Sequence, residues 1–174
     1  PEFYRLRIAG QIINIAIDST ETVSIKAEYP GMASQYEVSG SEECSRIKEL
    51  TLMQMGLQTQ LNAIANNPQL GADAVNDSVA RVVEAYKTRV KTDYIFKEPM
   101  KASSYFALFQ TLNAGGQSVL IFNPRSSEQD VKVFAAVATS WDTFYPNEER
   151  GENLHNIAIE GMKDIRIIKN KQAQ

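Results

Sequence analysis

The fold of this chain is decided by residues 36–50, YEVSGSEECSRIKEL. Before Gly40 the apolar residues recur at every second position, which is typical of a strand with one buried face. After Gly40 they recur at every third or fourth position, which is typical of an amphipathic helix. The spacing changes once and does not change back. We therefore predict an α+β fold class, with a short antiparallel β-meander followed by an all-helical region of about five helices.

Four segments with strand spacing make up the predicted meander, and short turn sequences separate them. They cover residues 4–8, 13–17, 23–29 and 36–38. Because the first strand begins almost at Pro1 and the strands are few, we expect an incomplete sheet whose neighbouring strands lie upstream. We also expect the sequence to be a piece of a longer protein.

Five segments with helical spacing follow the meander. They cover residues 41–66, 75–94, 105–112, 127–145 and 154–165. Ser41 is the predicted N-cap of the first, and Ser127 with Asp130 resembles a capping box at the fourth. Residues 119–122 fit a strand or a loop, and Gly115-Gly116 fits a mobile loop, because no Lys-Ser or Lys-Thr follows as in a phosphate loop.

The change of spacing also sets the predicted domains. Residues 1–40 are expected to form the C-terminal part of a β-rich domain, and residues 41–168 a helical domain. The polar tail, residues 169–174, has the composition of a linker.

Composition excludes several classes of function. The 174 residues carry a net charge of −3, which provides no electrostatic footprint for nucleic acid. One cysteine and one histidine exclude an internal disulfide, a CxxC pair and most metal constellations. No apolar run approaches the roughly 20 residues needed to cross a bilayer. We predict no catalytic residue, no cofactor and no metal in this segment.

Three features carry chemistry in other proteins, and the structural interpretation is favoured for each. Cys44 near a helix start could be a reactive thiolate, but Glu42 and Glu43 oppose that charge, so a structural thiol is expected. His155 needs a positioned partner for catalysis, and the sequence identifies none. Glutamates at positions 148, 149 and 152 fit a helix start better than an acid–base pair.

Aromatic residues are dense between positions 105 and 145. Most of them should form core, but some are expected to face a partner domain, since aromatic side chains concentrate in interfaces. The interface candidates are Tyr105, Phe109, Phe122, Trp141 and Tyr145.

Several segments in a fixed order resemble one family. They are FYRLRI (3–8), INIAIDSTETVSI (13–25), the junction 36–50, SSYFALFQ (103–110), LIFNPRSSEQDVKVFAAVATSW (120–141) and YPNEERGENL (145–154). Together they resemble the N-terminal region, partly a domain of unknown function, of Bacteroidetes envelope lipoproteins. Those lipoproteins carry a C-terminal thioredoxin-like domain of the TlpA/ResA type, a thiol–disulfide oxidoreductase family. The lipobox cysteine and the CxxC domain of that family do not occur in this sequence.

The resemblance implies an exported protein, periplasmic or anchored to the envelope, in which this segment is not itself the enzyme. We expect a non-catalytic accessory domain that positions or dimerises the thioredoxin-like domain of the same parent chain, or contacts its partner. A periplasmic module that binds a ligand or peptide is the alternative, in a groove or at an exposed sheet edge. A stand-alone hydrolase using scattered carboxylates is least favoured, since no nucleophile–base pair is visible.

Overall fold

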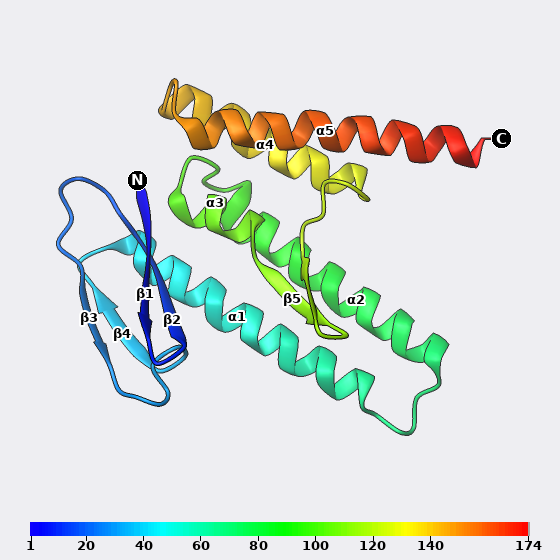
Figure 1. Cartoon of the computed structure of the whole chain (residues 1–174), viewed down its shortest axis with the longest axis horizontal. Coiled ribbons are helices and arrows are strands. Elements are labelled where there is room, and N and C mark those ends of the chain that lie inside the picture. The colour runs from blue at the N-terminus through cyan, green and yellow to red at the C-terminus, as the bar shows by residue number, and fades with distance from the viewer. Residues whose placement is uncertain (174) are drawn as a thin grey trace. The chain divides into compact units, whose positions relative to one another are not determined.

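The computed structural model describes residues 1–173 and has the α+β fold that the single change of spacing predicts (Figure 1). Strand pairs come first and helices dominate the rest of the chain. In order, the elements are β1 (Glu2–Ile8), β2 (Gln11–Ile17), β3 (Ser24–Ala27), β4 (Tyr36–Ser39), α1 (Glu42–Ala65), α2 (Ala72–Val90), the π-helical turn η1 (Lys91–Ile95), α3 (Ala102–Leu108), β5 (Thr111–Ala114), β6 (Gln117–Leu120), α4 (Glu128–Phe144) and α5 (Glu149–Gln172).

The chain divides into two compact units, residues 1–79 and 80–174, which are described separately. The division falls inside α2, whereas the change of spacing suggests one at Gly40. Helix α1 packs on β2 and β4, so the first long helix shares a unit with the strands that precede it.

The first unit contains two separate antiparallel hairpins. Strand β1 pairs with β2 along its whole length, from Glu2 opposite Ile17 to Ile8 opposite Gln11, and β3 pairs with β4. Strands β2 and β3 do not pair, so the prediction of one continuous meander is wrong. The reason lies in the core: residues of β2, β3 and β4 pack together around three buried side chains instead of lining one sheet. Those buried residues are Ile13, Met32 and Tyr36, and Ile15, Ile25 and Val38 pack against them.

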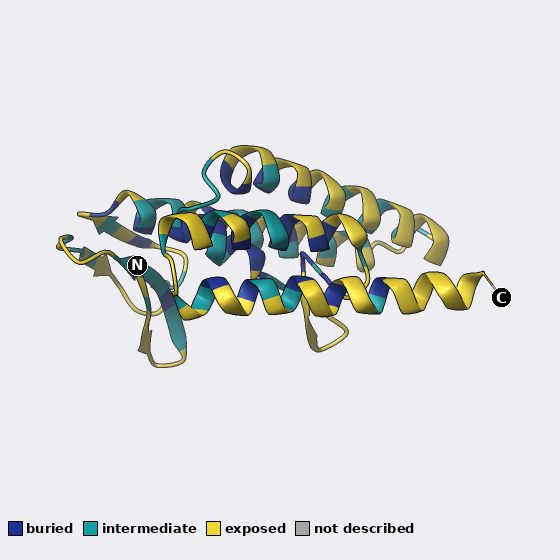
Figure 2. Cartoon of the chain, turned by 90° about the horizontal axis from the view of Figure 1, so that it is seen from above, coloured by how far each residue is buried: buried dark blue, intermediate teal, exposed yellow. Residues whose placement is uncertain are grey.

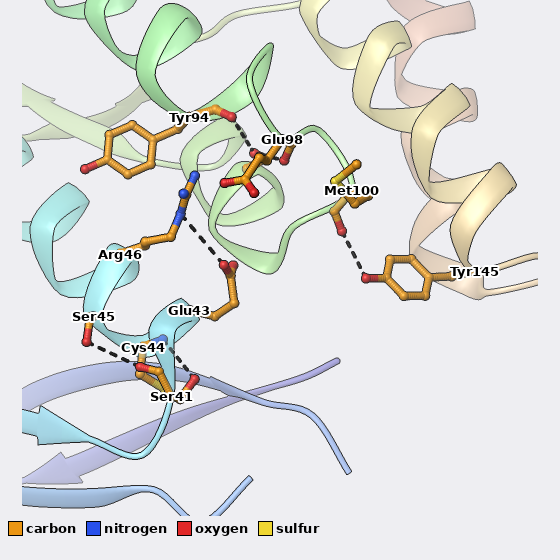
Figure 3. A network of polar contacts seen from close by, with 10 residues as sticks. Ser41, Glu43, Cys44, Ser45, Arg46, Tyr94, Glu98, Met100 and Tyr145 are labelled. Carbon is orange, nitrogen blue, oxygen red and sulfur yellow. Dashed lines mark hydrogen bonds and ion pairs between the residues drawn. The ribbon is translucent and has the colours of Figure 1, made fainter. Parts of the chain in front are cut away.

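The junction between β4 and α1 depends on Gly40. Its φ of +91° is in the region that favours glycine, and an added Cβ would lie 1.9 Å from the carbonyl oxygen of Thr22. Ser41 then caps α1, as predicted: its Oγ accepts a hydrogen bond of 3.2 Å from the backbone N–H of Cys44 (Figure 3).

In the second unit, α4 and α5 run side by side in opposite directions (Figure 1). The buried face of α4 includes Phe134, Val137 and Trp141, none of which has exposed surface. Gly161 of α5 lies against the loop before α4 and the first turn of α4, because an added Cβ would lie 2.4 Å from the carbonyl oxygen of Pro124 and 3.0 Å from Val131 Cγ2.

Two predictions for this unit are wrong. The third helix ends at Leu108, and residues 111–120 form the β5–β6 hairpin with Gly115-Gly116 as its turn, where Asn113 Oδ1 accepts a 3.0 Å hydrogen bond from the Gly116 N–H. Helix α5 continues to Gln172 instead of giving way to a linker at Lys169. No proline or glycine follows Gly161, so nothing stops the helix. Its last turns are exposed on all sides (Figure 2). Position 174 lies outside the described residues.

Candidate functional site

In the β1–β2 hairpin of the first unit, exposed apolar side chains follow one another at every second position of β1. Residues directly opposite each other in an antiparallel pair share a face, so Tyr4 and Leu6 lie on the same face as Ile15 and Ile13. Ile13 is fully buried in the core, but Tyr4 and Leu6 are 52% and 39% exposed. Ile8 follows on the same face at 50%. The core face of the hairpin therefore continues past β2 to an uncovered strand. We call these three residues the β1 apolar row.

The other face of β1 is cationic. Arg5 and Arg7 are exposed there, opposite Asn14 and Ile12 of β2. Neither arginine takes part in an ion pair among residues 1–173. Within residues 1–173, β1 pairs with β2 and with no other strand, so it is an edge strand of this sheet. One strand thus combines an apolar row, a cationic row and an edge that another strand could extend.

Cys44 has a structural environment, as predicted. Its side chain is 1% exposed, and its thiol donates a 3.1 Å hydrogen bond to the carbonyl oxygen of Ala16 on β2. Ser45 Oγ donates to the Ser41 carbonyl oxygen at 3.3 Å, so the first turn of α1 is held by local hydrogen bonds around this thiol (Figure 3). The contact joins α1 to β2 and leaves no open approach for a disulfide partner.

His155 has a partner that the sequence did not identify. Its Nε2 lies within hydrogen-bond distance of the Asp142 carboxylate, and the two side chains are 39% and 50% exposed. The pair lines an open hollow of about 470 Å³ together with Pro146, Asn147, Glu152 and Asn156. The available signal was the short turn at Tyr145-Pro146, since antiparallel neighbours bring residues on either side of their turn together.

This pair resembles the base–orienter half of a catalytic triad. The residues that line the hollow include no Ser, Thr, Cys or Lys to act as nucleophile. The arrangement can bind a polar ligand through carboxylate, imidazole and amide groups.

The glutamates at the start of α5 have separate roles. Glu148 is the N-cap: its carboxylate accepts a 2.9 Å hydrogen bond from the Arg150 N–H and forms a 2.9 Å ion pair with the Arg150 guanidinium. Glu149 lies in the first turn, where it meets the positive end of the helix dipole. Glu152 also lies in the first turn of α5, so the structural interpretation describes all three glutamates, and Glu152 lines the hollow in addition.

The five aromatic interface candidates do not form one surface. Phe122 and Trp141 have no exposed surface, so their proposed role as contact residues is wrong: they are core. Tyr105 packs against Trp141 and Phe109 in tilted geometry, with ring centroids 4.9 and 5.0 Å apart, and Phe109 is 36% exposed. Tyr145 donates a 3.1 Å hydrogen bond to the carbonyl oxygen of Met100 (Figure 3). These side chains hold the segment after η1 onto α4.

A buried ion pair was also missed by sequence reasoning. Lys87 Nζ lies 2.8 Å from Asp130 Oδ2, with the lysine side chain 9% and the aspartate 2% exposed. Asp130 Oδ2 also accepts a 2.8 Å hydrogen bond from the Asn123 N–H. The predicted capping box at Ser127 is therefore half correct: Ser127 Oγ accepts from the Asp130 N–H at 3.2 Å, but the Asp130 carboxylate bonds elsewhere.

Among residues 1–173, no group of three or more histidine, cysteine, aspartate or glutamate side chains is placed to hold a metal ion. No helix in the described part of the chain combines the length and the apolarity that crossing a membrane requires. Comparison of the chain with protein-family models, with curated proteins and with solved structures found no match.

Proposed function

We propose that this chain is a non-catalytic accessory domain of an exported thiol–disulfide oxidoreductase-like protein. Its role is to position or dimerise a thioredoxin-like domain, or to contact that domain's partner. The observation that carries this proposal is the β1 apolar row, which extends the core face of the hairpin onto an exposed strand. Exposed apolar surface that continues a core is a common mark of a protein-docking site. The resemblance adds the identity of the docked domain and a periplasmic or envelope-anchored location.

The environment of Cys44 supports a non-catalytic role for this domain, with thiol–disulfide exchange carried out by a separate redox domain. Thiol–disulfide exchange needs an accessible thiolate and a disulfide sulfur that it can reach. The Cys44 thiol is enclosed and donates its proton to a backbone carbonyl, so its present use is structural.

An insulin-reduction assay tests the non-catalytic part of the proposal. Purified chain in dithiothreitol should not accelerate insulin precipitation beyond dithiothreitol alone, and the Cys44→Ser variant should behave identically. Acceleration that Cys44→Ser abolishes would contradict the proposal, because the chain would then supply its own redox thiol.

A titration tests the docking part. Unlabelled TlpA-type thioredoxin-like domain, added to the ¹⁵N-labelled chain, should shift the amide resonances of residues 4–8. The Leu6→Asp variant should lose those shifts, because a carboxylate in the β1 apolar row opposes burial. The Met162→Asp variant is the matched control, since Met162 is 48% exposed on α5. Equal loss in both variants, or no shift in the wild type, would count against docking at β1.

A second candidate function rests on the hollow at His155. Its lining of Asp142, Asn147, Glu152, His155 and Asn156 suits a small polar ligand, in keeping with a periplasmic ligand-binding module. Thermal-shift measurements with sugars and short polar peptides test this candidate. A ligand that binds there should raise the melting temperature of the wild type, and His155→Gln should abolish the rise. Absence of any shift across the panel would remove the candidate.

A further inference from the structure

We propose that the open edge of β1 binds an extended segment of another polypeptide in which acidic residues alternate with apolar residues. The inference rests on the proposed docking role and names the chemistry of the partner. It comes from three properties of one strand: its backbone register, its charge and its apolar row.

The register shows which backbone groups meet the edge. The two-residue turn Ala9-Gly10, with φ values of 48° and 80°, closes the hairpin at the pair Ile8–Gln11. In an antiparallel ladder, alternate residues exchange hydrogen bonds with the partner strand, and the residues between them direct N–H and C=O groups to the other side. Counting back from Ile8, Leu6 bonds toward β2, whereas Arg5 and Arg7 present their backbone groups to the open edge.

The side chains then specify what an added strand must carry. On one face, Arg5 and Arg7 are exposed and have Asn14 and Ile12 as their cross-strand neighbours, so no carboxylate on β2 opposes them. On the other face lies the β1 apolar row. A strand added at this edge places successive residues on alternate faces. Its residues beside the arginines should be acidic, and those beside the apolar row should be apolar.

The same charges argue against a second copy of this chain as the occupant. Pairing two β1 strands about Arg5 in either direction, or antiparallel about Leu6, brings arginine beside arginine on one face. Antiparallel pairing about Tyr4 places Arg5 beside Phe3 and gives neither arginine a carboxylate. Like charges directly opposite on neighbouring strands destabilise the pair. A different polypeptide with carboxylates at every second position replaces that repulsion by attraction, and main-chain hydrogen bonds along the edge add affinity.

The test uses the whole chain and a synthetic probe. The probe is a seven-residue peptide of alternating valine and glutamate, labelled for fluorescence anisotropy, and its reference has lysine at the glutamate positions. The wild type should bind the glutamate peptide at least tenfold more tightly than the lysine peptide. The double variant R5E/R7E should reverse the preference. Peptide N-methylated at alternate backbone nitrogens should bind at least tenfold more weakly, because edge pairing needs those donors.

A matched control distinguishes an effect of the charges on β1 from an effect of the net charge of the chain. The double variant R166E/K171E changes the net charge equally at exposed positions of α5 and should leave the glutamate preference unchanged. Three outcomes would overturn the inference: no binding of the glutamate peptide up to millimolar concentration, equal binding of the two peptides, or equal loss in both double variants. If the peptide fails but the thioredoxin-like domain still shifts residues 4–8, the acidic-strand inference falls and the proposed docking role stands. The reverse pattern removes the proposed partner and keeps the edge site.

Discussion

The β1–β2 hairpin and the α4–α5 pair differ in how completely their apolar faces are buried. Each consists of two antiparallel elements joined by a short turn. In the helix pair, the contact face is closed: Trp141 and Phe134 of α4 and Leu154 of α5 have no exposed surface. In the hairpin, Ile13 of β2 is equally enclosed, but its cross-strand neighbour Leu6 is 39% exposed.

The two pairs also differ in how their exposed apolar side chains are arranged. The exposed apolar residues of α5 are spread around the helix: Ile167 and Ile168 are adjacent and so point about 100° apart. Those of β1 share one face with the core. We therefore interpret the α4–α5 pair as scaffold and the hairpin as the surface for a partner, and the predictions below test this contrast.

The largest effect should come from breaking the buried ion pair beside α4. Asp130→Ala leaves the enclosed Lys87 ammonium with only the longer 3.6 Å contact to the exposed Glu84 carboxylate, and it removes the acceptor of the Asn123 N–H. The free energy of unfolding of the second unit should fall by about 3–5 kcal/mol. Urea titration followed by the fluorescence of Trp141, the single tryptophan, measures this change in the second unit.

A double variant gives the control for that measurement. Lys87→Met with Asp130→Leu removes both charges and should recover at least half of the loss, because no unpaired charge stays buried. A loss below about 1 kcal/mol for Asp130→Ala would mean that water reaches the lysine, and the second unit would be less closed than the hairpin contrast requires.

The two strands of the hairpin should differ strongly in their tolerance of truncation. Ile13→Ala removes a fully buried side chain and should lower the free energy of unfolding of the first unit by about 2–4 kcal/mol. Leu6→Ala, directly across the ladder, should cost less than about 1 kcal/mol. Native-state hydrogen exchange of the β2 amides measures both. Equal costs would break the contrast, because Leu6 would then be a core residue and not part of a docking surface.

Alkaline pH should test the core beneath the hairpin. Burial raises the pKa of Tyr36 to about 12, and the nearby Cys44 adds to the rise. The folded state therefore prefers the neutral phenol: its stabilisation is complete below about pH 10 and is lost as the pH rises toward 12. The first unit should lose about 2 kcal/mol over this range.

The Tyr36→Phe variant isolates that contribution, since the other raised tyrosines stay in place. Its free energy of unfolding, measured by urea titration followed by circular dichroism at pH 9 to 12, should decline less steeply than that of the wild type. Identical slopes would show that Tyr36 ionises as easily folded as unfolded, and that the core beneath β2 is open to water.

Local sequence signals predicted the elements well and their long-range partners poorly. Ser41 as an N-cap follows from cap chemistry within a few residues, and the helix that it begins follows from the spacing of apolar residues over 41–66. The β5–β6 hairpin was missed because Leu112 continues a helical stripe, although Gly115-Gly116 supplies the turn of a hairpin.

Contacts between residues far apart in the sequence could not be predicted from local sequence signals. Lys87 and Asp130 are 43 positions apart, and nothing in either local sequence marks the other as its partner. The β1 apolar row is different: the alternation of Tyr4, Leu6 and Ile8 was visible, but the sequence could not show that no strand covers it. Exposure depends on which elements pack together, so the candidate site emerged only from the fold.

The smallest effect should come from the exposed pair on the outer side of the helices. His155→Ala removes the contact with Asp142, but both side chains are about half exposed, so the free energy of unfolding of the second unit should fall by less than about 1 kcal/mol. His155→Gln, which keeps a hydrogen-bonding group, should cost even less. A loss above about 2 kcal/mol would place this pair with Lys87–Asp130 as a structural bond of the scaffold, and the hollow beside it would then lose its interest as a ligand site.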